Sequence, residues 1–253
     1  MQEGMIMDLY YDKVLAIINE IRSTERDNIL KCARIVADQV KQDKLVYVFG
    51  PGGHSNLAAM EVFFRAGGLL HISAMINQET MLSAGAMKSM QVERLPGYGK
   101  IVVEDYNIGE GDLLWIVNAY GINSATIDAA LTARARGAKV IGVSSVEHAN
   151  TCPLEHPARH PSKQNLHDIV DAHVDCKVKQ GDAVLELEGL TQKIGAMSTF
   201  ANAYVMNCIV IEAVNMLVNE GIEPPIWRSG NAPGGDEWNN QFLDRFRDAV
   251  RCL

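Results

Sequence analysis

Apolar residues recur at helical spacing in two segments near the start of the chain, 9–21 and 29–40. This spacing places the apolar side chains on one face of each segment and predicts two amphipathic helices. Thr24 and Asp27 match the pattern of a capping box, so we expect the second helix to begin there. Both helices precede the first apolar run of strand length.

Short apolar runs alternate with helical segments through the middle of the chain. The predicted strands lie within 45–49, 69–75, 111–121, 138–145, 166–176 and 182–189. Helices are predicted over 56–66, 124–136 and 195–220, and a last one ends near 251. Segment 78–99, rich in Met, Ser and Gly, predicts only a long, partly helical loop. Because the strands are apolar throughout and alternate with helices, we expect a parallel sheet covered on both faces.

Length and composition narrow the class of protein. The chain has 253 residues, 47% of them hydrophobic, which is enough for one sizeable α/β domain. We predict a single domain over 1–253, with N-terminal helices at 1–43, an α/β core at 44–220 and a C-terminal loop and helix at 221–253. No apolar run approaches the roughly 20 residues that span a bilayer, so no membrane partner is expected.

Charge and cysteine usage indicate which partners are excluded and which cellular compartment is favoured. The formal net charge is −8, and the acidic residues are spread along the chain, which argues against a nucleic-acid partner. The five cysteines form no CxxC pair, which favours a reduced, cytoplasmic location.

The stretch GPGGHS, residues 50–55, joins a predicted strand to a helix, and such glycine-rich corners commonly hold a phosphate. A dinucleotide site needs G-x-G-x-x-G, but Ser55 stands at the third glycine position. A nucleotide P-loop needs a lysine after the glycines, and none follows. A sugar phosphate needs only backbone amides and hydroxyl groups. The corner therefore favours a phosphosugar, and we expect no cofactor.

Two further polar loops follow predicted strands. NAYGINSAT, residues 118–126, leads into a helix, and two serines end the next strand. Because the carboxyl ends of parallel strands share one edge of a sheet, we expect all three loops to meet there. For each serine or asparagine the alternative role is a helix cap. The candidate phosphosugar-binding residues are Gly52, Gly53, Ser55, Asn118, Tyr120, Gly121, Asn123, Ser124, Ser144 and Ser145.

The order of these motifs resembles the SIS (sugar isomerase) domain of phosphosugar isomerases and phosphosugar-binding proteins. The likeness covers about residues 5–220 and, with GDAVLELEGL and GIEPPIW, is closest to a stand-alone branch of SIS proteins. It implies a three-layer, doubly wound, flavodoxin-like sheet of about five parallel strands, with N-terminal helices and a long C-terminal helix. It also implies a homodimer or homotetramer.

The resemblance maps the family's first phosphate loop onto residues 50–55 and its hydroxyl-rich second loop onto 118–123, with Ser124 adjacent. Asn118, Tyr120 and Asn123 replace hydroxyl residues of that second loop. The expected ligand is a sugar phosphate at the carboxyl edge of the sheet, and aldose–ketose isomerisation is the first hypothesis for the reaction.

Isomerisation needs a base that moves a proton between adjacent carbons, and a histidine often helps to open the ring. The candidate catalytic residues are Glu61, Glu188 and His54. Glu61 has apolar neighbours in the helix after the first loop, so it is either a desolvated base or a solvent-facing residue. Glu188 shares a strand face with Glu186, and its alternative is a solvated edge.

Two other functions stay open from the sequence. One is a non-catalytic phosphosugar sensor that acts through a protein partner. The other is a lyase similar to the amino-sugar phosphate etherases, which LEGLTQKIGAMST resembles, with Glu61 or Glu79 as acid and base. Four potential metal ligands recur every four residues in 148–160, but prolines in the same stretch prevent a helix, so we expect no metal site.

Overall fold

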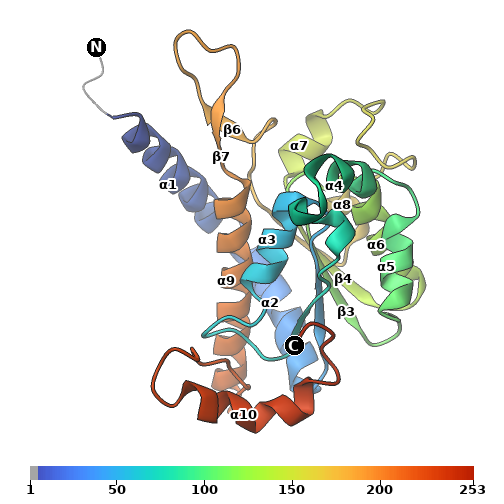
Figure 1. Cartoon of the computed structure of the whole chain (residues 1–253), viewed down its shortest axis with the longest axis vertical. Coiled ribbons are helices and arrows are strands. Elements are labelled where there is room, and N and C mark those ends of the chain that lie inside the picture. Colours follow the sequence, from blue (N-terminus) through green and yellow to red (C-terminus); the bar gives the residue numbers. More distant parts are fainter. Residues whose placement is uncertain (1–4) are drawn as a thin grey trace.

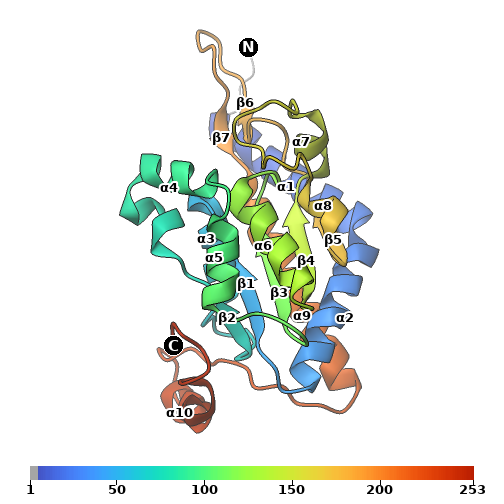
Figure 2. The ribbon, with the colours of Figure 1, turned by 90° about the vertical axis from the view of Figure 1, so that its right-hand side faces the viewer.

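The structure, a computed structural model, describes residues 5–253. Its centre is a parallel sheet with the strand order β2-β1-β3-β4-β5 (Figures 1 and 2). Neighbouring strands are in matched register, with Val46 opposite both Ile72 and Leu113. The prediction of a doubly wound sheet of about five parallel strands is confirmed. The strands are β1 (Val46–Phe49), β2 (Ile72–Ala74), β3 (Leu113–Val117), β4 (Lys139–Ser144) and β5 (Ala172–Asp175).

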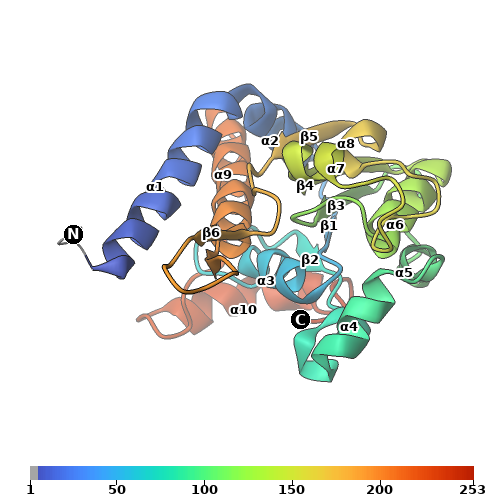
Figure 3. The same ribbon diagram turned by 90° about the horizontal axis from the view of Figure 1, so that it is seen from above.

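Helices cover both faces of this sheet and give three layers (Figure 3). One layer holds α1 (Ile6–Thr24), α2 (Arg26–Lys41), α3 (Gly53–Glu61) and α9 (Ser198–Asn219). The other holds α5 (Tyr98–Asp105), α6 (Ser124–Ala135) and α8 (Leu166–Ile169).

Strand β3 shows why the strands are apolar throughout. Trp115 packs into the core on the side of α2 and α9, whereas Leu114 and Ile116 pack on the side of α5 and α6. Successive side chains of a strand point to opposite faces, so a strand covered on both faces has no position for a polar residue.

Helix α9 is the one helix in residues 5–253 that is long and apolar enough to cross a membrane. Its inner face packs against α1, α2 and α3. Val205, Met206 and Ile209 on that face are each 0% exposed. This packing accounts for the apolar sequence, and we interpret α9 as a core helix.

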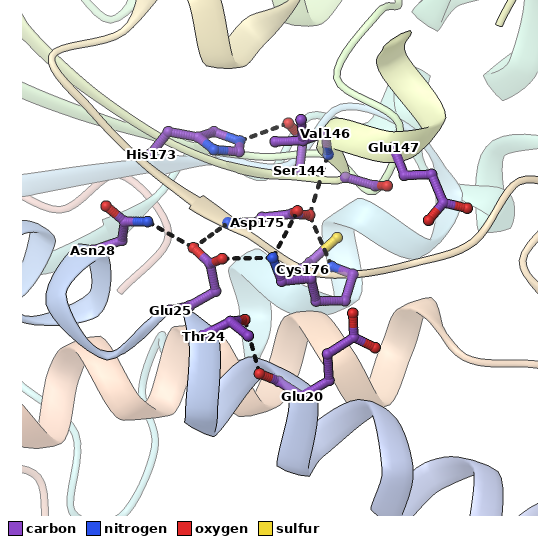
Figure 4. Close-up of polar contacts among 12 residues, drawn as sticks. Glu20, Thr24, Glu25, Asn28, Ser144, Val146, Glu147, His173, Asp175 and Cys176 are labelled. Carbon is purple, nitrogen blue, oxygen red and sulfur yellow. Dashed lines mark hydrogen bonds and ion pairs between the residues drawn. The ribbon is translucent and has the colours of Figure 1, made fainter. Parts of the chain in front are cut away.

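Some element predictions were wrong. Thr24 does not cap the second helix: it is the last residue of α1, and its hydroxyl donates to the Glu20 carbonyl at 2.8 Å (Figure 4). Residues 166–176 form α8 and then β5 rather than one strand. The predicted strand at 182–189 contributes β6 (Ala183–Leu185), which pairs with β7 (Ile194–Ala196) in a separate antiparallel hairpin.

The unassigned segment 78–99 is more ordered than expected. It contains two short 3-10 turns, helix α4 (Ala86–Glu93) and the start of α5. The turns are η1 (Gln78–Thr80) and η2 (Leu82–Ala84).

The C-terminal tail packs at the amino end of the strands. Leu69, just before β2, forms a bridge with Ile226. Trp227 is buried with Leu70 and with Phe246 of α10 (Gly235–Phe246). Figure 1 shows α10 at the opposite end of the molecule from the β6–β7 hairpin and α7 (Val146–Thr151). Within one chain the glycine-rich loop that precedes α10, residues 228–234, is therefore remote from the carboxyl edge of the sheet.

A buried ion network joins the end of β5 to the turn between α1 and α2 (Figure 4). Lys177 Nζ lies 2.6 Å from Glu25 Oε1 and 3.0 Å from Asp175 Oδ2. Asp175 also accepts a hydrogen bond from the backbone N–H of Val146 at 3.1 Å. The three charged side chains are at most 16% exposed, so this network fixes the sheet edge from which α7 starts.

Candidate active site

A cavity of about 180 Å³ opens at the carboxyl ends of β1 and β3. In the observed strand order these neighbours flank the point where the chain reverses its direction across the sheet, which is where doubly wound folds bind ligands. The loops after both strands, helix α4 and the start of α9 form its walls. The lining residues are Gly52, Gly53, His54, Ser55, Leu82, Ala86, Ser89, Met90, Glu93, Asn118, Ala119, Tyr120, Asp182 and Ser198.

The glycine corner allows the backbone to approach other groups closely. A Cβ added at Gly50 would lie 2.1 Å from the Ser55 carbonyl oxygen. Gly52 has a φ of +100°, and a Cβ there would lie 2.0 Å from Oε2 of Glu93. Both positions therefore require glycine, and the second brings a carboxyl group against the start of α3.

Helix α3 begins inside this corner rather than after it. Asn56 is the first residue whose N–H bonds within the helix, donating to the Gly52 carbonyl at 3.0 Å. The N–H groups of Gly53, His54 and Ser55 precede it and have no partner in the helix. These three residues line the cavity, and the amino end of the helix gives this wall a positive potential.

Asn118 fastens the first loop to the second. Its Nδ2 donates to the Pro51 carbonyl at 3.0 Å and to Ser55 Oγ at 3.3 Å. Its Oδ1 accepts from the backbone N–H of Tyr120 at 3.2 Å and of Gly121 at 2.8 Å. The side chain is only 3% exposed, so one buried amide sets the relative position of both loops.

Glu93 ends α4 and turns its carboxyl group into the cavity. Burial raises the pKa of Glu93 to about 7, against the opposing influence of the neighbouring Arg94. No group in residues 5–253 donates a hydrogen bond to this carboxyl. Near neutral pH it is present in both protonation states, which suits a group that removes and returns protons.

Tyr120 forms the wall of the cavity at the second loop. Its ring stacks on that of His148, with centroids 4.2 Å apart and an angle of 27° between the planes. Burial, together with the negative charges of Asp182 and Glu93, raises the pKa of Tyr120 to about 12. The phenol therefore stays protonated at neutral pH and can donate a hydrogen bond to a ligand.

Asp182 closes the cavity at the start of α9. Its Oδ1 accepts from the backbone N–H groups of Met197 at 2.9 Å and Ser198 at 2.7 Å. Its Oδ2 accepts from the Ser198 hydroxyl at 2.7 Å. These bonds cap α9 and compensate the charge of the carboxylate.

The structure brings six of the predicted site residues into the cavity lining: Gly52, Gly53, His54, Ser55, Asn118 and Tyr120. It does not bring the rest of the second loop there. Segment 158–166 instead contacts this part of the loop: the backbone N–H groups of His160 and Leu166 donate to the carbonyls of Ile122 and Gly121 at 2.8 Å, and Asn123 Nδ2 donates to the Ala158 carbonyl at 3.4 Å. The Ser124 hydroxyl is buried and has no hydrogen-bond partner among residues 5–253.

The two predicted serines after β4 also lie outside the lining. Ser144 Oγ bonds to His173 Nε2 at 2.8 Å (Figure 4). Ser145 Oγ accepts from the His148 backbone N–H at 3.0 Å and caps α7. Both serines are 0% exposed, so their hydroxyls serve the packing at the end of β4.

The two predicted catalytic glutamates are remote from the cavity. Glu61 lines a separate groove, where its carboxyl lies 3.3 Å from Arg65 Nη2 and accepts from Asn207 Nδ2 at 3.3 Å. Glu188 is exposed in the loop between β6 and β7, in the hairpin that projects from the body of the molecule (Figure 1).

Four lining residues with polar side chains were missed by the sequence reasoning: Ser89, Glu93, Asp182 and Ser198. The sequence predicted no defined helix or strand within segment 78–99, so it did not indicate which of its side chains share a face. Ser89 and Glu93 are four residues apart, a spacing that puts both on one face of a helix. That spacing was the signal available for α4.

Among residues 5–253, no group of three or more His, Cys, Asp and Glu side chains is arranged to hold a metal ion. In segment 148–160, His148 stacks on Tyr120, whereas His160 Nε2 bonds to Asp128 Oδ1 at 3.0 Å.

Comparison with known proteins gives consistent matches. Residues 9–145 match the family described as SIS domain. A UPF0309 protein of Geobacillus thermodenitrificans is 31% identical over 248 residues, which cover 98% of either chain. A UPF0309 protein of Brucella canis is 35% identical over 243 residues, covering 96% of this chain and 97% of its own.

Solved structures share the architecture at low sequence identity. Phosphoheptose isomerase from Neisseria gonorrhoeae superposes with a TM-score of 0.53 and 13% identity, covering 83% of this chain and 96% of its own. A phosphoheptose isomerase from Francisella tularensis gives a TM-score of 0.53 and 12% identity, covering 85% of this chain and 100% of its own. These superpositions show a common fold and, at this identity, the fold alone.

Proposed function

Since the chain belongs to the SIS domain family, as its motifs indicated, we propose that it binds a sugar phosphate at the carboxyl edge of its sheet. We further propose that it interconverts the aldose and ketose forms of that sugar. One observation carries the proposal: the first residues of α3, whose amides have no partner in the helix, and the titratable carboxyl group of Glu93 line the same cavity.

The phosphate is assigned to the start of α3. Three unpaired N–H groups and the positive end of the helix dipole favour an anion there. Ser55 Oγ accepts a hydrogen bond from Asn118, so its own hydrogen is free to donate to a phosphate oxygen. Tyr120, in the loop after β3, supplies a further donor to the same cavity.

The base is assigned to Glu93. Isomerisation removes a proton from one carbon and returns it to the next, and a base acts best when its pKa lies near the working pH. Glu93 meets this condition through burial, whereas the carboxyl groups of Glu61 and Glu188 do not reach the cavity. His54, whose side chain is exposed at the edge of the cavity, is assigned to ring opening.

The test has a binding arm and a chemical arm. A thermal-shift screen of the purified protein against sugar phosphates and their free sugars detects binding without assuming a reaction. For each ligand that binds, NMR in deuterated water follows exchange of the proton at the carbon next to the carbonyl. Glu93→Gln is expected still to bind the phosphate group, so that a ligand still raises its melting temperature, and to slow exchange by about 10² to 10⁴-fold. Glu61→Gln, the competing carboxyl group, is expected to exchange at the wild-type rate.

Each other outcome has a distinct meaning. Binding without exchange would favour the non-catalytic sensor, and cleavage of the bound sugar would favour the lyase. If Glu61→Gln loses exchange and Glu93→Gln keeps it, the base is Glu61, in the separate groove. If no sugar phosphate raises the melting temperature, the proposal is rejected.

Two broader expectations accompany this proposal. We propose that residues 1–253 form one cytoplasmic domain and assemble as a homodimer or homotetramer. Exposed apolar side chains on α1 and α9 support this expectation, because a second subunit could bury them; Tyr11 is 61% exposed and Ile211 is 62% exposed. Light scattering coupled to size-exclusion chromatography measures it directly.

A further inference from the structure

The charge of the cavity indicates which class of sugar phosphate it accepts, and this inference rests on the proposed function. Two of its lining residues are carboxylates, Glu93 and Asp182. His54 is the only basic side chain in the lining, which contains no Lys or Arg among the described residues. Arg94 follows Glu93 in the chain but does not line the cavity. A purely anionic ligand would therefore meet a cavity with an excess of negative charge.

The two carboxylates are not equivalent. Asp182 receives three hydrogen bonds, from the backbone of Met197 and from the backbone and hydroxyl of Ser198. It also lies at the positive end of α9. Its charge is compensated inside the protein, so Asp182 needs nothing from a ligand.

Glu93 has no such compensation. Its carboxyl oxygens receive no hydrogen bond from residues 5–253, although the side chain is partly buried. Oε2 lies against Gly52, directly before the amides that hold the proposed phosphate. A bound phosphate and an ionised Glu93 would be close neighbours of the same charge and would repel each other.

A cationic group on the ligand removes this conflict. We propose that the substrate is an amino sugar phosphate with a free ammonium group, which pairs with Glu93 while the phosphate binds the start of α3. When the amine is at C2, moving the C2 proton to C1 leaves an imine at C2, and water hydrolyses this imine to the ketose phosphate with release of ammonia. An acetylated amine carries no charge and is bulkier, and a hydroxyl group is neutral, so neither replaces the ammonium group. The ion pair also keeps Glu93 ionised beside the phosphate, which is the form that the proposed base requires.

The experiment measures dissociation constants by calorimetry at pH 7 for matched sets of ligands. Glucosamine, galactosamine and mannosamine 6-phosphates are each compared with the N-acetyl derivative and with the hexose 6-phosphate that carries a hydroxyl group instead. Wild-type protein is expected to bind at least one amine at least about tenfold more tightly than both counterparts, as a charged hydrogen bond implies.

Variants then locate the source of the preference. In Glu93→Gln the preference is expected to fall to within about twofold, because an amide cannot form the ion pair. Glu104→Gln removes an equal charge from α5, outside the cavity, and is expected to keep the full preference. Melting curves without ligand verify that each variant is folded. The comparison of ligands on the wild-type protein does not depend on the variants.

The outcomes separate this inference from the proposed function. If N-acetyl or hydroxyl ligands bind as tightly as the amines, the inference is overturned and phosphosugar binding stands. If the amine is preferred and Glu93→Gln keeps the preference, the assignment to Glu93 is overturned. If none of the nine ligands binds, the inference is overturned, and the wider phosphosugar panel decides the proposed function.

Discussion

Replacing Asn118 by alanine tests whether a single amide organises the cavity. The side chain makes four hydrogen bonds, two from Nδ2 to the first loop and two to Oδ1 from the second. Asn118→Ala removes all four and leaves the Pro51 carbonyl and the Gly121 N–H without these partners.

The magnitude follows from the distances. The two shorter bonds, at 3.0 and 2.8 Å, contribute about 1 kcal/mol each, and the two longer ones, at 3.3 and 3.2 Å, about half as much. The variant should therefore lose about 3 kcal/mol of unfolding free energy, which lowers the melting temperature of a chain of this size by about 6–12 °C. Because the first loop is no longer held, ligand affinity should fall as well.

Urea denaturation and calorimetric titration measure both effects. Asn123→Ala is the matched control, since Asn123 is also 3% exposed but its side chain makes a single long bond to the described part of the chain, at 3.4 Å to the Ala158 carbonyl. The control should cost less than about 1 kcal/mol. Equal losses of stability in the two variants would refute the organising role of Asn118.

Three further predictions concern the backbone, the ion network and a buried histidine. Gly52→Ala should abolish turnover, because the added Cβ displaces the Glu93 carboxyl group. Gly67→Ala is the control: Gly67 also has a positive φ, of +84°, but a Cβ there would have no atom within 4 Å, so turnover should be kept. Equal activities of the two variants would contradict the close contact between Gly52 and Glu93. Lys177→Met leaves two buried carboxylates unpaired and should cost about 3–5 kcal/mol in urea denaturation, and a cost below 1 kcal/mol would argue against the network. Burial lowers the pKa of His173 to about 4, so the unfolded chain binds its proton first and stability should fall as the pH drops from about 6.5 towards 4, by up to about 3 kcal/mol. Melting temperatures measured over this pH range should depend less on pH in His173→Gln than in the wild type. An equal dependence in the two proteins would assign the effect to other groups.

The sequence by itself determined the architecture and half of the cavity. Apolar runs such as 113–117 are buried on both faces, and this requirement is written locally in the chain. The glycine corner likewise carries its own signal, since a backbone that turns at Gly50 and Gly52 needs residues without a Cβ. Because parallel strands end at one edge, the meeting of Ser55 with Asn118 and Tyr120 could also be expected.

Only the tertiary structure decided which carboxyl group enters the cavity. Glu93 reaches it because α4 packs beside the first loop, a contact between segments that no local pattern specifies. The burial that raises its pKa comes from the same packing. Ser144 and Ser145 stand at the end of a parallel strand as expected, yet their hydroxyls form hydrogen bonds with His173 and with the backbone at the start of α7. Periodicity sets the local conformation and the buried face of an element, but the partner of a polar side chain is set by whichever distant group packs nearest to it.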